Sequence, residues 1–417
     1  MTKSHLYLEK HAFATPRWAD YQVRAIGTDA PPFPPQDIKS ILVIKMDALG
    51  DYLLITPMIT NLKQNFPTAK ITWVCTQRVG VLARNNPDID LVITPPGKWV
   101  NDPPANFMFG VAIQKSDFSP FDLILVPRWG EDWYLASGLA CIVDAPYRLG
   151  YSARCLPLKE KHFSHYDDFY THVIDDTLPT HEVWRGLQFC DALGAQIPAA
   201  EDIFLTLPLL AEDYAALTSY DLMSRARPLI SLGVGGAYDF KRWSAENFSQ
   251  LAKALHEKFG ATIAIVGQGD DDYQAAAHVF ANLPASHSVN AVGLLTEQQS
   301  AALLSQCDLH IGNDSFPMHA AAAVGTPVVE IIGKATTGSP DSEYLPRRFG
   351  PWGVPFCYIQ PTDCNDPITT VSDTHEEPTC IAEIPVAAVL AAVETFLPKL
   401  SEFKRPWHHS GNLEVFL

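Results

Sequence analysis

Short apolar runs alternate along the chain with longer stretches in which apolar residues return at helical spacing. The first run, Ile-Leu-Val-Ile at residues 41–44, is typical of a parallel strand buried on both faces. After a turn that contains glycine, apolar residues recur at the spacing of one helix face: Ile55, Ile59, Leu62 and Phe66. Further apolar runs follow at residues 71–75, 91–93 and 121–126. Strands that alternate with helices in this way predict a doubly wound α/β domain.

The same alternation begins again after a connection dotted with prolines at residues 197–210. A helix is expected from about Ala245. Four apolar runs predict further strands at residues 229–232, 262–266, 309–312 and 327–333. The simplest architecture is therefore two doubly wound α/β domains that face a central cleft.

The domain boundaries are predicted from these runs. We expect a first domain over residues 39–205, a second over residues 206–395 and a tail over residues 396–417. The proline run at residues 31–35 is stiff and cannot continue a helix, so residues 1–38 are expected to form an N-terminal extension. Such an extension is either an arm packed on the surface or a contact to a partner.

The length and composition agree with two globular domains. The 417 residues match two domains of about 100–200 residues each, and 47% of them are hydrophobic against 18% charged. No apolar run approaches the roughly 18–20 residues of a membrane span, and residues 1–20 lack the apolar stretch of a secretory signal. Eight scattered cysteines favour reduced thiols. We therefore expect a cytoplasmic protein.

The net charge of −17 is unevenly distributed. Residues 1–160 contain 16 basic and 15 acidic residues, whereas residues 161–417 contain 14 and 32. Because no basic footprint is visible, a nucleic-acid partner is not expected. The acidity is interpreted as a solvated surface, and an anionic partner would fit the first half better.

Three strand-to-helix turns carry candidate chemistry, because ligands of open α/β sheets bind beyond the carboxyl ends of the strands. In the first turn, residues 45–51, Gly50 permits a close approach or an unusual backbone angle, and Asp51 stands at the start of the following helix. The Asp51 carboxylate can face the cleft and take a proton, or it can merely complement the helix dipole.

The second turn, residues 233–243, combines a glycine-rich bend with Lys241 and Arg242. This composition suits a phosphate but also describes a solvated pair of cations, and it matches neither a Walker loop nor the G-x-G-x-x-G pattern. The third turn, residues 312–327, places Pro317 at the first position of an alanine-rich helix. The N-terminus of such a helix is an anion site, and the alternative is a capped, buried helix with a satisfied histidine.

Taken together, these turns resemble the pattern of glycosyltransferase family 9, the heptosyltransferase type. The family opens with a strand, an R/K-x-[SD]-x-x-G-D turn and a helix with Thr-Pro, which residues 45–51 and 56–57 match. Residues 241–243 match its K-R/H-W element, and residues 313–329 match its N-D-S-G-P-M-H-L-A-A-A-x-G-T-P-V-V stretch. The resemblance covers residues 40–395 in order.

The resemblance implies a GT-B fold, with the acceptor on the first Rossmann-like domain and a nucleotide-activated sugar on the second. The implied activity is an inverting, metal-independent sugar transfer, with heptose from ADP-heptose as the expected donor and a saccharide such as a lipopolysaccharide core as the acceptor. No cofactor is expected besides this co-substrate. A glycolipid acceptor would bring the protein to the inner face of the inner membrane as a peripheral protein.

The resemblance also implies roles for single residues. Asp51 matches the general base that deprotonates the acceptor hydroxyl, with Asp47 as the second candidate. Lys241 matches the residue that steadies the diphosphate leaving group, helped by the helix amides after Asp314. Asp314 matches a residue that holds sugar hydroxyls, because a carboxylate would repel a diphosphate, and His319 matches one near the donor phosphates.

Further candidates extend the two expected subsites. The expected donor-binding set also includes Ser315, Gly235, Gly236 and Asp271, the last within the aspartate run 270–272 where the family often binds the nucleoside. On the acceptor side, Asp47 and the following basic residues are candidates for contacts with the acceptor and its phosphates, or are ordinary surface charges: Arg128, Arg148, Arg154 and Lys159.

Two features depart from the family pattern. Phe316 stands where the family has glycine, so its side chain can block the approach of phosphate, change the choice of donor or point away. Four possible metal ligands gather near the end of the second domain, but their spacing is not C-x-x-C, so a plain set of thiols without metal is expected: Cys357, Cys364, His375 and Cys380.

Other classes of protein stay as alternatives. Another GT-B nucleotide-sugar enzyme, an epimerase or a hydrolase, is the alternative enzyme, and a non-catalytic GT-B binding protein is favoured by Phe316. Residues 88–90 formally match the D-x-D of a GT-A transferase, but Asn-Pro-Asp before a strand is typical of a turn. A nicotinamide dehydrogenase would need a glycine fingerprint that the chain lacks.

Overall fold

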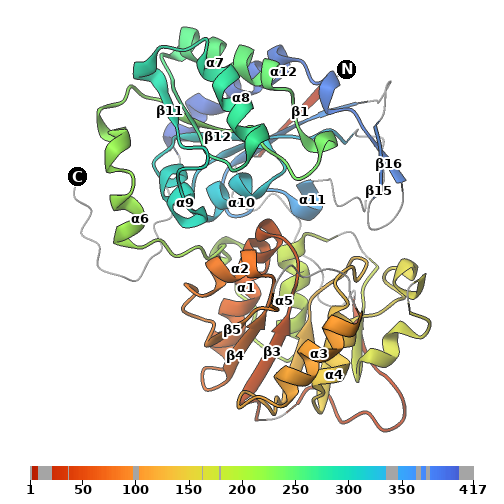
Figure 1. Cartoon of the computed structure of the whole chain (residues 1–417). Coiled ribbons are helices and arrows are strands. Elements are labelled where there is room, and N and C mark those ends of the chain that lie inside the picture. The colour runs from red at the N-terminus through yellow and green to blue at the C-terminus, as the bar shows by residue number, and fades with distance from the viewer. Residues whose placement is uncertain are drawn as a thin grey trace.

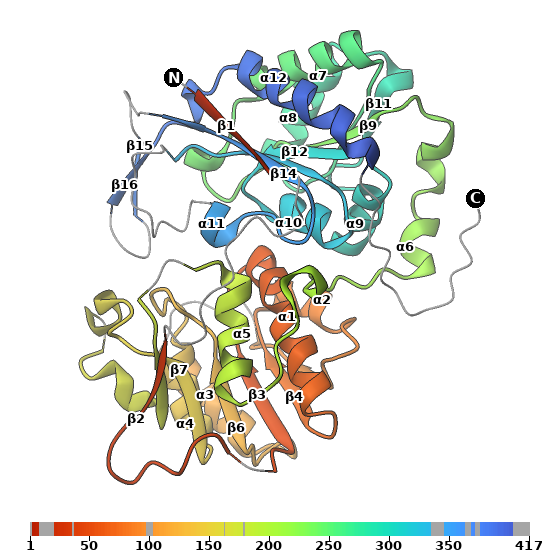
Figure 2. The ribbon, with the colours of Figure 1, turned by 180° about the vertical axis from the view of Figure 1, so that it is seen from behind.

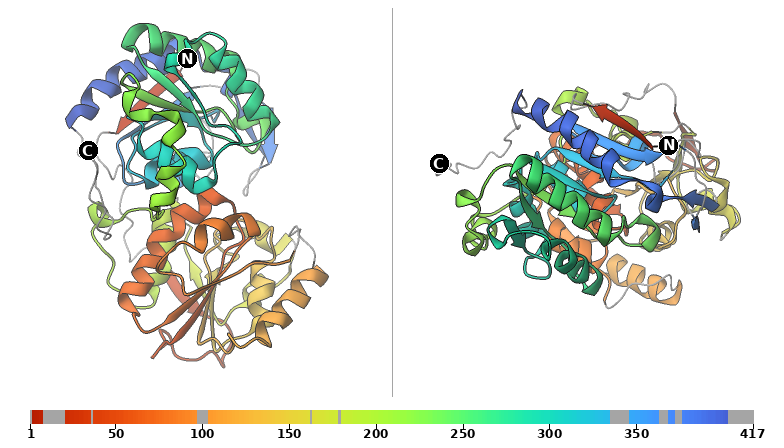
Figure 3. Two further views of the ribbon diagram at one scale, coloured as in Figure 1. Left: turned by 60° about the vertical axis from the view of Figure 1, so that its left-hand side comes forward. Right: turned by 90° about the horizontal axis from the view of Figure 1, so that it is seen from above.

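The computed structural model describes residues 2–7, 21–35, 37–96, 103–161, 163–177, 180–334, 346–362, 368–371 and 376–402. These residues form two α/β domains, the first in the lower half of Figure 1 and the second in the upper half. Each domain is built on a seven-stranded sheet with helices packed against it (Figure 3). Among the described residues, no helix combines the length and the apolarity that a bilayer crossing requires.

The first sheet contains the following strands: β2 (Gln22–Ala25), β3 (Ser40–Ile44), β4 (Lys70–Val74), β5 (Leu91–Ile93), β6 (Leu123–Val126), β7 (Tyr147–Tyr151) and β8 (His172–Asp175). They lie in the order β2-β8-β7-β6-β3-β4-β5, and all pairs are parallel except β2 with β8. Without β2 this is the 3-2-1-4-5-6 order of a doubly wound domain, which confirms the prediction.

The second sheet repeats this order with strands β1 (Thr2–Tyr7), β9 (Leu229–Gly233), β10 (Thr262–Ile265), β11 (Ser288–Asn290), β12 (Leu309–Asn313), β13 (Val328–Ile331) and β14 (Phe356–Pro361). The order is β1-β14-β13-β12-β9-β10-β11, with only β1 antiparallel. A separate hairpin pairs β15 (Ile368–Val371) with β16 (Glu376–Thr379). The second α/β unit is thus also doubly wound.

The helices connect and cover these strands, and Figure 2 shows them from behind. In the first domain they are α1 (Leu49–Asn65), α2 (Gln77–Ala83), α3 (Pro103–Gln114), α4 (Ala136–Val143) and α5 (Glu182–Ala192). The helices that come after α5 in the chain are α6 (Ala211–Ala215), α7 (Ala245–Phe259), α8 (Asp270–Phe280), α9 (Glu297–Ser305), α10 (Phe316–Ala323), α11 (Pro346–Phe349) and α12 (Val386–Phe396).

The N-terminal segment contributes a strand to each sheet. Strand β2 pairs with the edge strand β8 of the first sheet, and β1 pairs with the edge strand β14 of the second. The strand β1, drawn in red, therefore lies within the upper domain of Figures 1 and 2. An edge strand offers unpaired N–H and C=O groups, and these two additions satisfy them. The segment expected as a surface arm or a partner contact is instead built into both sheets.

The central strands are buried along almost their whole length because helices cover both faces of each sheet. In β3, Ile41 and Val43 belong to one buried cluster, whereas Leu42 and Ile44 belong to another on the opposite face. The first of these clusters continues through α1 and α5 into α10 of the second domain. The two domains therefore share one continuous apolar core at their junction.

Aromatic residues fasten this junction. The Trp352 ring lies edge-on to Trp184 of α5, with ring centroids 5.4 Å apart, and its Nε1 donates a hydrogen bond to the backbone oxygen of Ile203 at 2.9 Å. His181, directly before α5, donates from Nε2 to the backbone oxygen of Gly350 at 3.1 Å. The loop after α11 is thus held against the first domain.

A buried group of charges lies beside these aromatic residues. Oε1 of Glu182 accepts hydrogen bonds from Arg185 Nη1 at 2.6 Å and from Arg348 Nε at 2.8 Å. Both guanidinium groups lie over the Trp129 ring, 4.0 and 4.8 Å from its centroid. Burial opposes ionisation of Glu182, but the charges of Arg185 and Arg348 outweigh it and lower its pKa to about 2. Arg348 therefore ties the second domain to the first.

We predict that Trp352→Ala lowers the free energy of unfolding by about 3–5 kcal/mol, because it removes a fully buried ring from the domain junction. Denaturant-induced unfolding followed by circular dichroism measures the change. The control is Trp133→Ala, whose side chain is 40% exposed and whose loss is expected to change the free energy of unfolding by about 0.5 kcal/mol or less. Equal stability of the two variants would contradict the role given to Trp352.

Candidate functional site

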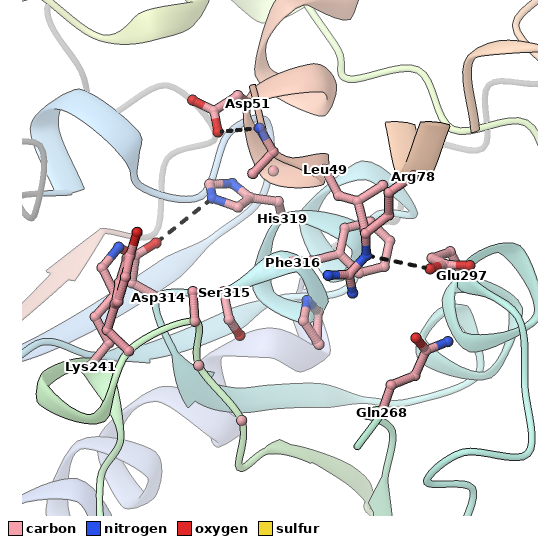
Figure 4. Close-up of a pocket in the computed structure, with 18 of the residues that line it drawn as sticks. Leu49, Asp51, Arg78, Lys241, Gln268, Glu297, Asp314, Ser315, Phe316 and His319 are labelled. Carbon is pink, nitrogen blue, oxygen red and sulfur yellow. Dashed lines mark hydrogen bonds and ion pairs between the residues drawn. The ribbon is translucent and has the colours of Figure 1, made fainter. Parts of the chain in front are cut away.

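A cleft of about 920 Å³ lies between the two domains. Its walls come from the segments that follow the parallel strands β3, β6, β9, β10 and β12, at the carboxyl edges of both sheets. Figure 4 shows part of its lining. All three turns singled out in the sequence reach this cleft, which is where doubly wound sheets bind their ligands.

Asp51 lies in the first turn of α1 and lines the cleft. Its Oδ2 atom accepts a hydrogen bond from the backbone N–H of Ala48 at 3.3 Å, at the helix N-terminus. Burial and then the charge of Asp47 raise the pKa of Asp51 from 3.8 to about 6, although Lys45 and Arg128 act in the opposite direction. This carboxyl group can therefore exchange a proton close to neutral pH.

Asp47 has a contrasting environment. Its Oδ2 atom lies 2.6 Å from Lys45 Nζ, and its Oδ1 atom lies 2.8 Å from Arg128 Nη1. Burial alone would raise the pKa of Asp47, but the charges of Arg128 and Lys45 outweigh burial and lower it. Asp47 is thus held as a carboxylate and is a weak base, whereas Asp51 has no cation bonded to it among the described residues.

Gly50 makes the close approach expected of it. A Cβ atom at this position would lie 2.6 Å from Cδ2 of His319, which comes from α10 of the other domain. Burial lowers the pKa of His319 to about 4, so its ring is neutral at neutral pH. Its Nδ1 atom has no partner among the described residues, and its Nε2 atom lies 3.9 Å from Asp314 Oδ1. The two halves of the cleft meet at this contact (Figure 4).

Lys241 and Asp314 form an ion pair on the second domain. The Nζ atom of Lys241 lies 2.7 Å from Oδ2 of Asp314, and both side chains are largely buried. Lys241 ends a short turn after β9, and Asp314 directly follows β12, so the pair joins the two central strands where the sheet order reverses. The N-terminal end of α10 opens into the cleft beside this pair.

The start of α10 differs slightly from the prediction. Phe316 is its first residue and Pro317 its second, so the proline stands one position later than expected. Ser315 is the residue before the helix and lines the cleft, but its side chain makes no capping hydrogen bond. The first-turn amides therefore lie beside the cleft without a side-chain acceptor from Ser315.

The glycine-rich turn after β9 is closed by Asp272. A Cβ atom at Gly235 or at Gly267 would collide with the Asp272 carboxylate, which also accepts the backbone N–H of Gln268 at 3.0 Å. The Asp272 carboxylate thus occupies the space that a side chain at either position would need. Asp272, which the sequence analysis did not single out from its neighbours, holds the turns after β9 and β10 together.

The neighbouring aspartate and arginine form a second contact on this wall. Arg242 Nη1 lies 2.6 Å from Oδ2 of Asp271, and Arg242 Nε donates to the backbone oxygen of Gly236 at 2.8 Å. Gly236 and Asp271 both line the cleft. Arg242 is thus a structural tie between the two loops and not the solvated cation that the sequence allowed.

The basic residues expected on the acceptor side differ from one another. Arg128 lines the cleft but is bonded to Asp47, whereas Arg154 is exposed, pairs with Asp175 at 3.3 Å and is absent from the described lining. Arg148 pairs with Asp144. Lys159 is buried and donates hydrogen bonds to two backbone oxygens, so its expected place on the surface is wrong. Burial lowers the pKa of Lys159 to about 8.

Phe316 extends toward the first domain. Figure 4 shows its side chain near Leu49 and Arg78, on the other side of Ser315 from Lys241. It is half-buried and packs against the shared core. The ring therefore does not cover the Lys241–Asp314 pair, and it forms part of the wall at the opposite end of the cleft.

Two of the four possible metal ligands near the end of the second domain lie in the described residues. Cys357 is a buried free thiol, whereas Cys380 is in a disulfide, which departs from the expected set of reduced thiols. Cys364 and His375 lie outside the described residues. Within the described parts of the chain, no three His, Cys, Asp or Glu side chains gather in a way that could hold a metal ion.

Several lining residues escaped the sequence analysis. Trp133 and Tyr134 follow β6, Arg78 is the second residue of α2, Tyr238 precedes Lys241, and Glu297 begins α9. Arg78 Nε lies 3.9 Å from Oε1 of Glu297, which links the domains across the cleft (Figure 4). The rule that ligands bind beyond the ends of parallel strands could have found Trp133 and Tyr134, because the strand before them was predicted.

We predict that Asp51→Asn stabilises the protein above pH 6 but not at pH 4. Because the folded-state pKa of about 6 lies above 3.8, the unfolded chain releases this proton first, and stability falls as the pH rises from about 4 to 6. Asparagine removes that cost, so the variant is expected to gain roughly 1–3 kcal/mol at pH 8. Denaturant-induced unfolding at pH 4 and pH 8 measures the change in the free energy of unfolding, with Asp117→Asn, at an exposed position, as the control. An equal effect of Asp51→Asn at both pH values would contradict the shifted pKa.

Known proteins with similar sequences were found in two comparisons. The model of glycosyltransferase family 9 (heptosyltransferase) matches residues 142–341. Lipopolysaccharide heptosyltransferase 3 of Escherichia coli strain K12 is 27% identical over 300 residues, which cover 68% of this chain and 79% of that protein.

Solved structures show the same fold. The glycosyl transferase family 9 protein of Veillonella parvula superposes with a TM-score of 0.67 at 21% identity, covering 87% of this chain and 97% of that one. The Escherichia coli ADP-heptose lps heptosyltransferase II gives a TM-score of 0.60 at 19% identity, covering 87% and 99%. These likenesses confirm the predicted GT-B fold. In sequence, the chain is similar to glycosyltransferase family 9 over residues 142–341 and to a lipopolysaccharide heptosyltransferase over 68% of its length.

Proposed function

We propose that the protein is an inverting glycosyltransferase that moves heptose from ADP-heptose to a saccharide of the lipopolysaccharide-core type. Two similar proteins support this choice of substrates. One is named a lipopolysaccharide heptosyltransferase, and the other an ADP-heptose lps heptosyltransferase. The observation that carries the proposal is the arrangement across the cleft, where Asp51, with a pKa of about 6, faces the donor-domain wall of Lys241 and α10. A base and an anion site are the two groups that such a transfer requires.

In this proposal, Asp51 is the general base. It takes the proton of an acceptor hydroxyl while the hydroxyl oxygen forms a bond to the anomeric carbon of the donor sugar. The bond between that carbon and the diphosphate oxygen breaks, and its electron pair leaves with the diphosphate. Attack opposite to the leaving group inverts the configuration. Asp47 is less suited to this role because Lys45 and Arg128 hold its charge, and it anchors Arg128 on the acceptor side.

The donor diphosphate is proposed to bind at Lys241 and at the N-terminal end of α10. Lys241 is paired with Asp314, and an incoming diphosphate would replace this carboxylate as the partner of the ammonium group. Asp314 then holds sugar hydroxyls, because a carboxylate against a diphosphate would repel it. The neutral His319 ring can donate one N–H hydrogen bond to a phosphate oxygen.

The remaining proposed donor contacts lie on the same wall of the cleft. Ser315, Gly235 and Gly236 are proposed to contact the donor, and Asp271 is proposed to lie toward the nucleoside. Because Lys241 and the helix amides supply positive charge for the leaving group, the proposal includes transfer without a metal ion. A lipid-linked acceptor would place the protein as a peripheral protein on the cytoplasmic face of the inner membrane.

The function is tested by incubating the protein with ADP-heptose and a lipopolysaccharide core that lacks heptose. We expect release of ADP and a product whose mass has grown by one heptosyl residue, with inverted anomeric configuration by NMR. We also expect kcat/KM to rise with pH up to about 6 and then to level off, because Asp51 must be ionised to accept the proton.

Asp51→Asn serves as the test of the base in this assay. Its rate of transfer is expected to fall by about 10²–10⁴-fold with ADP affinity retained, whereas Asp117→Asn keeps the wild-type rate. Free heptose or an altered nucleotide sugar as the only product would favour a hydrolase or an epimerase. ADP binding without any turnover would favour a non-catalytic binding protein.

We predict that Lys241→Ala weakens ADP binding by roughly 10–100-fold, because a charge-assisted contact to phosphate is lost. Calorimetric titration measures this affinity, and Lys253→Ala, an exposed lysine of α7, is the matched control. Asp314→Asn is expected to keep or increase the affinity for ADP while raising the KM for ADP-heptose, since the competing carboxylate is gone but a sugar contact is lost. Unchanged ADP affinity in Lys241→Ala would remove Lys241 from the phosphate site.

A further inference from the structure

Large aromatic side chains line the cleft while staying open to solvent. The Tyr238 side chain is 58% exposed and the Trp133 side chain 40% exposed, although most large apolar side chains of the protein are buried. Tyr134 and Phe240 line the same cleft. Aromatic surface that stays in contact with water inside a cleft is typical of a ligand-binding groove.

These aromatic residues come from both domains. Trp133 and Tyr134 follow β6 in the first domain, whereas Tyr238 and Phe240 lie in the turn after β9 in the second. The rings of Tyr238 and Phe240 are stacked, with centroids 5.1 Å apart and planes within 6° of each other. Phe240 therefore covers one face of the Tyr238 ring, which is otherwise largely exposed.

The loop that carries Trp133 and Tyr134 is firmly held. Buried Asn106 donates from Nδ2 to the backbone oxygens of Tyr134 and Leu135, at 3.3 and 3.0 Å. The Asp132 carboxylate accepts the backbone N–H groups that follow, of residues 136 and 137, at 2.9 Å each. Leu135 has a φ of 55°, a left-handed conformation that costs energy for a residue with a side chain. These hydrogen bonds hold the backbone of the loop from which the two aromatic side chains reach the cleft.

The aromatic residues lie close to the proposed base. Burial, followed by the charges of Asp47 and then Asp51, raises the pKa of Tyr134, and Tyr238 adds to the same effect. Tyr134 is thus close enough to Asp47, Asp51 and Tyr238 for each of them to affect its pKa, and all four residues line the same cleft. The nucleoside end of the cleft, with Gln268 and Glu297, lies on the far side of Ser315 from Lys241 (Figure 4).

We propose that Trp133, Tyr134 and Tyr238 form the subsite that holds the saccharide ring of the acceptor. A sugar ring has an apolar face of C–H groups and an edge of hydroxyls, and Tyr and Trp offer a flat apolar face with a polar group at the rim. The acceptor is the ring assigned here because its hydroxyl must reach Asp51. This inference rests on the proposed function and adds the residues that select the acceptor.

The test compares acceptor and donor parameters in matched variants. Tyr238→Ala and Trp133→Ala are each expected to raise the KM for the heptose-deficient core by about tenfold, because stacking is lost, while the ADP affinity stays within about twofold. Tyr238→Phe keeps the ring face and is expected to restore the acceptor KM. The control is Tyr273→Ala, which removes a tyrosine that is 60% exposed on α8 and does not line the cleft.

Acceptor binding is also measured by calorimetry on the protein saturated with ADP, so that the subsite is tested without turnover. Transfer with an unchanged acceptor KM in both alanine variants would overturn this inference and leave the proposed function intact. A parallel loss of ADP affinity would assign the rings to the donor instead. Absence of both transfer and acceptor binding in the wild-type protein would overturn the proposed function together with the subsite.

Discussion

The close approach of α1 and α10 is the constraint on which the cleft depends. At Gly50 the backbone of the first domain comes so near to the His319 ring of the second that even a methyl group would collide with it. The next residue along α1 is Asp51, and the residues just before α10 include Asp314. The contact between Gly50, which has no side chain, and His319 therefore sets the distance between the proposed base and the proposed donor site. The shared apolar core and the aromatic junction at Trp352 hold this approach in place.

Two nearby carboxyl groups, Asp47 and Asp51, have pKa values shifted in opposite directions by their electrostatic surroundings. Asp47 is bonded to Lys45 and Arg128 and stays ionised, whereas Asp51 lies in buried surroundings beside that negative charge and holds its proton more tightly. A pair of titratable groups whose surroundings push their pKa values apart is a common basis of acid–base assignments. On the opposite wall, Lys241 has Asp314 as its partner. In the proposed function, exchange of that partner for phosphate would couple donor binding to the release of the Asp314 carboxylate.

The sequence predicted the parts of the fold that repeat a local pattern. Continuous apolar runs located the central strands, and turn residues located Gly50, Asp51 and Lys241 at the cleft. Strand β7 was missed because arginine and glycine interrupt its apolar residues. Strand β1 was missed because it pairs with β14 near the other end of the chain, which no local pattern encodes. Lys159 was misplaced because its burial depends on the backbone oxygens of Arg128 and Tyr151, which accept its hydrogen bonds only in the folded domain. The position of Trp133 and Tyr134 after a predicted strand could be found from the sequence, but their exposure could not, because exposure is a property of the assembled domains.

A crystal structure of the protein with bound ADP tests the central claim most directly. The account predicts that the diphosphate lies at the N-terminal end of α10 with Lys241 Nζ within hydrogen-bond distance of a phosphate oxygen, and that the Lys241–Asp314 ion pair is open. Asp51 is then expected across the cleft from the terminal phosphate, with room for a sugar between them. ADP bound elsewhere, or bound with the Lys241–Asp314 pair intact and Lys241 away from phosphate, would contradict the account.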